Sequence, residues 1–75
     1  MEEHSKMKGT ILEWVDHIGT NHGLFVPDRQ IKDLSRQGRA LVYKLDADMN
    51  IIRDNGKRIV CLVTMEKCKV VGHQD

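Results

Sequence analysis

The sequence predicts one small, mostly β domain with five or six short strands and one short helix. Strand-like runs recur at short intervals between clusters of Gly, Asn and Asp, one of these runs alternates apolar and polar residues, and an Asn-Gly pair separates two others. No long amphipathic helix interrupts the pattern. Because so small a sheet hides its edges by closing, we expect a small barrel.

The length and composition allow only one core. The chain has 75 residues, of which 40% are hydrophobic and 31% charged, and a chain this short buries only about 60% of the surface that its unfolded form exposes. Such a composition is typical of a folded globular domain. We expect a flexible N-terminal tail over residues 1–7, one domain over residues 8–72 and a C-terminal tail over residues 73–75.

The first third of the domain predicts two strands around a turn. Residues 8–16 carry Thr, Ile, Trp and Val, which suit a half-buried pleated surface. Residues 17–23 contain two glycines and an asparagine, which favour a tight turn. The second strand follows over residues 23–27 and ends at Pro27, because proline has no backbone N–H to donate to a neighbouring strand.

A short helix is expected next, over residues 29–37. Asp28 is a suitable N-cap, and Gly38 stands where a left-handed residue commonly ends a helix. Residues 39–47 then alternate, with Leu41, Tyr43 and Leu45 on one face of a third strand.

The last part of the domain predicts a hairpin and a closing strand. Strand-like runs over residues 49–54 and 57–65 flank Asn55-Gly56, a pair that favours a type I′ turn because both of its residues tolerate positive φ. A final strand is expected over residues 67–71. Five or six strands with one short helix fit an OB-like or SH3-like barrel.

The sequence carries no pattern that indicates catalysis or a bound metal. The segment 46–50 begins like a calcium-binding loop, but Ile51 stands where that loop needs a glycine and Lys57 where it needs a glutamate. His17 and His22 flank a turn without a matching Cys or His pair. We therefore expect a protein that is not an enzyme and that holds no cofactor and no metal.

The two cysteines and the hydropathy pattern predict a cytoplasmic protein without a membrane partner. The sequence shows no apolar leader and no apolar span of about 18 residues, so a reducing compartment and free thiols are expected. Cys61 lies in an apolar run and is expected to be buried, while Cys68 lies between two lysines and is expected to be more accessible.

The charges are distributed unevenly along the chain. The net charge is only +1, yet residues 29–44 contain five basic side chains and one acid, and residues 53–69 contain five basic side chains and two acids. A basic face of this kind can neutralise phosphates. Ordinary solubilising surface charges would give the same pattern, so charge alone leaves both interpretations open.

Parts of the chain resemble a known family. KGTILEWVD over residues 8–16, the glycine turn and Gly23-Leu-Phe-Val resemble the opening of a cold-shock domain, and residues 37–45 and 59–63 resemble its later strands. The resemblance implies an OB-fold barrel that binds single-stranded RNA or DNA on one sheet face. Of the aromatic cluster in the second strand of that family, this chain retains only Phe25.

The sequence therefore predicts a small binding domain for single-stranded RNA or DNA, in which aromatic rings stack on bases and basic side chains contact phosphates. The alternative is a protein-interaction module, or a small regulator that docks on a larger nucleic-acid-processing machine through a sheet edge or the short helix. The candidate nucleic-acid-binding residues are Lys8, Trp14, His22, Phe25, Arg39, Tyr43, Lys44, Lys57 and Arg58.

Overall fold

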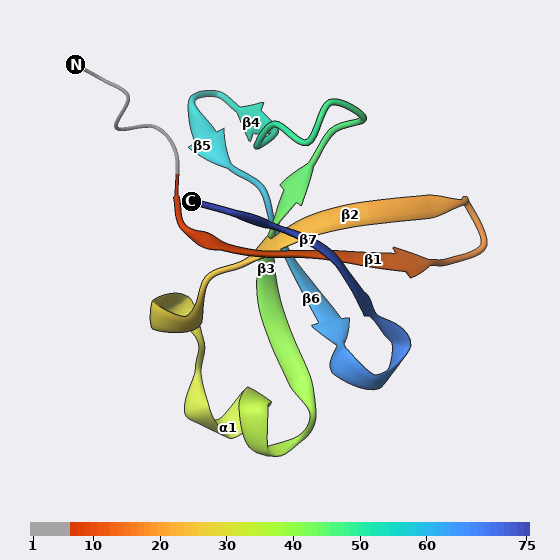
Figure 1. Cartoon of the computed structure of the whole chain (residues 1–75). Helices are drawn as coiled ribbons and strands as arrows, with labels where there is room; N and C mark the ends of the chain where they lie inside the picture. Colours follow the sequence, from red (N-terminus) through yellow and green to blue (C-terminus); the bar gives the residue numbers. More distant parts are fainter. Residues whose placement is uncertain (1–6) are drawn as a thin grey trace.

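The computed structural model describes residues 7–75. Its main element is a five-stranded antiparallel sheet with the strand order β6-β3-β2-β1-β7. Figure 1 shows β1, β2 and β7 running across β3 and β6. The five strands are β1 (Gly9–Val15), β2 (Thr20–Phe25), β3 (Arg39–Leu45), β6 (Val60–Thr64) and β7 (Lys69–Gln74).

Smaller elements connect these strands. A separate two-stranded sheet pairs β4 (Arg53–Asp54) with β5 (Lys57–Arg58). Two 3-10 turns, η2 (Pro27–Arg29) and η3 (Met65–Lys67), and one short helix, α1 (Lys32–Arg36), complete the described chain. The predicted class, mostly β with one short helix, is confirmed.

The first hairpin turns earlier than predicted. The Asp16 carboxylate accepts hydrogen bonds from the backbone N–H groups of Ile18 and Gly19, at 2.8 and 3.1 Å, and this closes the turn. β2 then begins at Thr20, so residues 21–23 lie in the strand and not in the turn. An aspartate that caps its own loop made the tight turn possible without the second glycine.

The predicted helix begins later than expected. Pro27 starts η2, and Ile31 is extended, with φ −105° and ψ 125°, directly before α1. Asp28 therefore lies inside η2 and does not cap the helix. Gly38 has φ +74°, so the predicted left-handed residue after the helix is confirmed.

The Asn-Gly hairpin is confirmed. Asn55 and Gly56 have φ values of 53° and 79°, and Asp54 pairs with Lys57 across the two-residue loop. Both residues are thus left-handed, as the type I′ turn requires.

Where the pairing of β2 with β3 ends, the Gln30 side chain supplies the hydrogen bonds that a neighbouring strand would give. After Pro27 the chain turns away, and the β3 backbone at Leu41 would lose its neighbour. The Gln30 side chain takes that place: its Nε2 donates to the carbonyls of Val26 and Leu41, and its Oε1 accepts from the Leu41 N–H, each at 2.9 Å. A side-chain amide thus satisfies backbone groups that the ladder leaves open.

Two clusters of buried side chains cover the two faces of the sheet. The first cluster consists of Leu12, Ala40, Val42 and Val63, and the second of Leu24, Val26 and Leu45. Since β1 and β6 are not neighbours in the sheet but share the first cluster, the sheet curls around it. We call the side of the first cluster the inner face and the side of the second the outer face.

Gly23 leaves room on the inner face for the side chains of Val42 and Trp14. A Cβ at this position would lie 2.6 Å from Cγ2 of Val42 and 3.0 Å from Cη2 of Trp14. A glycine is therefore required here for packing, and not for a turn.

Within the described residues, the sheet has two free edges. The strand order begins at β6 and ends at β7, and these two strands are not paired with each other. β7 extends to Gln74, so residues 73 and 74 belong to the sheet, whereas the sequence placed them in a tail. Met7 packs against the second cluster, and residues 1–6 of the predicted N-terminal tail lie outside the described residues.

Candidate functional site

The candidate residues lie on both faces of the sheet. Trp14 and Lys44 lie on the inner face, because β1 and β3 alternate about Leu12 and Val42. Tyr43 packs against the second cluster on the outer face. No single surface can present all of them, and the structure divides them into two sites.

The first site is a groove at Trp14, which we call the Trp14 groove. It measures about 300 Å³ and lies between the end of β1, the edge of β6 and η3. The Lys44 ammonium lies 5.4 Å from the centre of the Trp14 ring and also contacts Oδ1 of Asn21. The Trp14 groove is lined by Trp14, Val15, Asp16, Leu62, Val63, Thr64, Lys67 and Cys68.

Charges of both signs surround the Trp14 groove. An adjoining hollow shares four of its residues and adds Glu13, Glu66 and Lys69. Carboxylates therefore lie beside the ammonium groups that a phosphate would need, and they oppose the binding of a polyanion.

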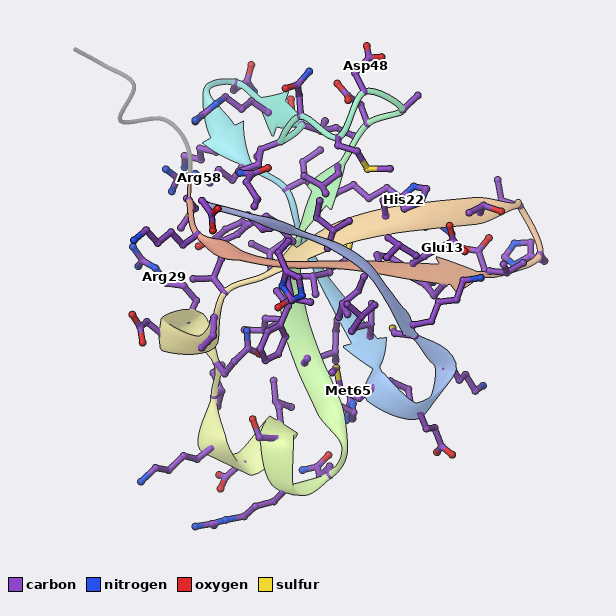
Figure 2. The ribbon with its side chains drawn as sticks, viewed as in Figure 1. Glu13, His22, Arg29, Asp48, Arg58 and Met65 are labelled. Atoms are coloured by element: carbon purple, nitrogen blue, oxygen red, sulfur yellow. The ribbon has the colours of Figure 1, made fainter. Side chains whose placement is uncertain are left out.

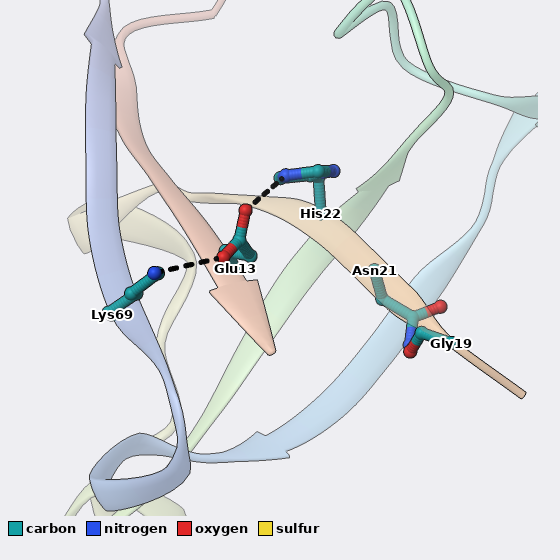
Figure 3. A network of polar contacts seen from close by, with 5 residues as sticks. All are labelled: Glu13, Gly19, Asn21, His22 and Lys69. Atoms are coloured by element: carbon teal, nitrogen blue, oxygen red, sulfur yellow. Dashed lines mark hydrogen bonds and ion pairs between the residues drawn. The ribbon is translucent and has the colours of Figure 1, made fainter. Parts of the chain in front are cut away.

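Glu13 holds a polar network on the outer face, drawn in Figure 3. Its two oxygens contact Nε2 of His22 at 3.0 Å and Nζ of Lys69 at 3.3 Å. The hydrogen bonds from His22 and Lys69 lower the pKa of the Glu13 carboxyl. His22 is thus engaged with a carboxylate from the neighbouring strand, and this contact occupies the side chain proposed to bind nucleic acid.

The second site is an apolar notch on the outer face, which we call the Tyr43 notch. It measures about 120 Å³ and is lined by Arg29, Leu41, Val42, Tyr43 and Val60. The Arg58 guanidinium lies 5.6 Å from the centre of the Tyr43 ring. Figure 2 shows Arg29 and Arg58 on the same side of the molecule. Among residues 7–75, no carboxylate lines this notch.

Arg29 is a site residue that the sequence did not single out. It was one of five basic residues in a charged stretch, and only the turn η2 carries it to the notch. Pro27 begins that turn, and its fixed φ was the one feature of the sequence that could have indicated a turn at Arg29.

The remaining candidates lie apart from the notch lining. Phe25 packs against the first cluster, so its ring is part of the core. Arg39 contacts the Gln37 side chain at the beginning of β3. Lys8 precedes β1, and Lys57 lies in the β4–β5 hairpin, both exposed.

The two thiols differ from expectation. Both Cys61 and Cys68 are half-buried and pack against the first cluster. Burial raises the pKa of the Cys68 thiol, whose Sγ lies 3.5 Å from the Thr64 carbonyl oxygen. The expectation that Cys61 is buried is therefore wrong, and the expectation that Cys68 is the more accessible thiol stays a prediction.

Within residues 7–75, no group of three or more His, Cys, Asp or Glu side chains is placed to hold a metal ion. The same residues include no helix long and apolar enough to cross a membrane. Comparison of the chain with known protein families, curated proteins and solved structures gives no match.

Proposed function

We propose that this chain is a small, non-enzymatic domain that binds single-stranded RNA or DNA at the Tyr43 notch. The proposal rests on an aromatic ring with the Arg58 guanidinium 5.6 Å from its centre, at an apolar notch that Arg29 also lines and that has no carboxylate among its described lining residues. A base needs an apolar, polarisable surface, and its phosphates need cations within a few ångströms.

The two sites differ in the charges that surround them, and this difference favours the Tyr43 notch over the Trp14 groove as the nucleic-acid-binding site. The groove and its adjoining hollow include Glu13, Asp16 and Glu66. The notch has Arg29 in its wall and Arg58 at the Tyr43 ring. Because guanidinium groups bind phosphate oxygens in a bidentate manner and also stack on bases, this pair suits a nucleotide better than a mixed-charge groove does.

Arg58 retains hydrogen-bonding capacity in the described structure. Its Nε is buried and has no acceptor among residues 7–75. A buried donor without a partner costs about 1–3 kcal/mol. A phosphate that draws the guanidinium toward itself would supply the missing acceptor and offset that cost.

We also propose that the fold is a small barrel. A curled five-stranded sheet whose non-adjacent strands β1 and β6 share one core supports a small barrel of the OB or cold-shock-like or SH3-like type. In such a partly open barrel β6 and β7 are the two edges, and their backbones are not paired with each other. The cytoplasmic location and the resemblance to cold-shock domains are part of the same proposal.

The test is a titration of fluorescein-labelled single-stranded RNA and DNA with the full chain, read by anisotropy at two salt concentrations. The logarithm of affinity should fall linearly with the logarithm of salt concentration. Arg29→Gln and Arg58→Gln should each weaken binding and reduce the salt slope by about 1. Tyr43→Leu should weaken binding by about 1–3 kcal/mol while circular dichroism stays unchanged.

Arg36→Gln is the matched control. Arg36 lies on α1, its side chain is exposed, and it contacts only Asp33 among the described residues. Its replacement should leave affinity unchanged. If RNA and DNA fail to bind at low salt, the proposal is wrong, and the alternative, a protein-interaction module, becomes the better account of this chain.

A further inference from the structure

Two edges of the sheet lack a neighbouring strand within residues 7–75. The β3–β6 register is bounded by hydrogen bonds from the Lys44 N–H to the Ile59 carbonyl and from the Met65 N–H to the Gly38 carbonyl. Since bonded and non-bonded pairs alternate in an antiparallel ladder, the backbone groups of Val60 and Leu62 point away from β3. The opposite edge is formed by β7, which pairs only with β1.

Both edges expose apolar side chains. Val60 and Leu62 on β6 are 51% and 45% exposed, and Val70 and Val71 on β7 are 59% and 44% exposed. β6 contains no charged residue and no proline. Soluble proteins protect free edges with charges, prolines or covering segments, and β6 has none of these on its own strand.

The charges at the ends of the two strands are complementary in one orientation. In an antiparallel pair with Leu62 opposite Val71 of a second copy, the register extended beyond β6 brings Arg58, at the end of β5, level with the second copy's Asp75. At the other end, the same register brings Glu66, in η3 after β6, toward the second copy's Lys67 and Lys69, which lie just before and at the start of β7. A parallel pair would bring Arg58 to the lysine end and Glu66 to Asp75, which places like charges together.

We propose that this chain self-associates by antiparallel pairing of the β6 edge of one copy with the β7 edge of the next. The two surfaces differ, so the contact is head-to-tail and leaves one free edge of each kind on every dimer. Further copies add until a ring closes or an open chain forms. The β6 edge shares Val60 with the Tyr43 notch, and Arg58 is used at both, so the variants that test self-association change Leu62 and Val70, which do not line the notch.

The experiment measures the mass of the full chain by light scattering over a wide range of concentrations. The wild-type mass should rise above the 8.6 kDa of one copy. Leu62→Lys and Val70→Lys each add a charge to one edge and should each give the mass of one copy at all concentrations. An equimolar mixture of these two variants should restore a species of two copies, because each supplies the edge that the other lacks.

Ile18→Lys is the control, because Ile18 is 83% exposed in the β1–β2 turn and away from both edges. It should associate as the wild type does. Circular dichroism and thermal melts establish that every variant is folded. A wild-type mass of one copy at the highest concentration overturns the proposal. A mixture that stays at one copy also overturns it. So does a Val70→Lys variant that associates normally, since pairing of β6 with β6 would give that result.

Discussion

Replacing Gln30 tests how much one side chain stabilises the fold at the place where the pairing of β2 with β3 ends. Gln30→Leu keeps most of the side-chain volume and removes three hydrogen bonds, each of 2.9 Å, to Val26 and Leu41. A net contribution of about 0.5–1.5 kcal/mol per bond predicts a loss of about 2–4 kcal/mol in the free energy of unfolding. In a domain of this size that loss lowers the melting temperature by at least about 8 °C.

The assay is urea unfolding followed by circular dichroism, with Gln37→Leu as the matched control. The Gln37 side chain is exposed and contacts only the Arg39 guanidinium among the described residues, so its replacement should change stability by less than about 0.5 kcal/mol. Equal unfolding midpoints for the two variants would refute the reasoning. Gln30→Glu sharpens the test, because it keeps the acceptor for the Leu41 N–H but at neutral pH turns a carboxylate toward two carbonyl oxygens.

Two further predictions concern the packing at Gly23 and the first turn. Gly23→Ala should lower the free energy of unfolding by about 1–3 kcal/mol, because the added Cβ would overlap the Val42 side chain; an unchanged thermal melt would show that the inner face has room for a Cβ at this position. The hydrogen bonds from Ile18 and Gly19 lower the pKa of Asp16 from its ordinary 3.8, so wild-type stability should fall as the pH drops from about 3.8 through this lower value. Asp16→Asn keeps an acceptor oxygen and should show a shallower decline in acid than wild type in urea titrations at several pH values, and parallel acid limbs would contradict this.

Local signals in the sequence were sufficient for most of the strands. The Asn55-Gly56 turn and the alternation from Arg39 to Leu45 depend only on neighbours in the chain, and both are confirmed. Asp16 caused the first error, because its carboxylate can close a turn that composition alone assigned to the glycines further along. Pro27 caused the second, since it begins a 3-10 turn and delays the helix.

Non-local contacts explain what the sequence could not supply. In the sequence Gln30 is an ordinary polar residue. Its role depends on the backbone N–H and carbonyl of Leu41, eleven residues further along the chain, which have no strand partner where β2 has ended. Gly23 was assigned to a turn, although the side chains of Val42 and Trp14 are what exclude a Cβ there. Both roles follow from contacts between residues far apart in the chain, and no pattern in a short window indicates them.

The division of the aromatic residues between two faces has a direct consequence for function. Phe25 pairs with Val42 on adjacent strands, and Tyr43 is the next residue along β3. Because successive side chains of a strand point to opposite faces, a surface that presents Tyr43 cannot also present Phe25. Trp14 shares the inner face with Phe25, where its ring lies against Gly23. A platform of stacked rings, as the family resemblance implies, would need these three residues on one face, so the proposed site has to obtain its affinity from one ring and the guanidinium groups around it.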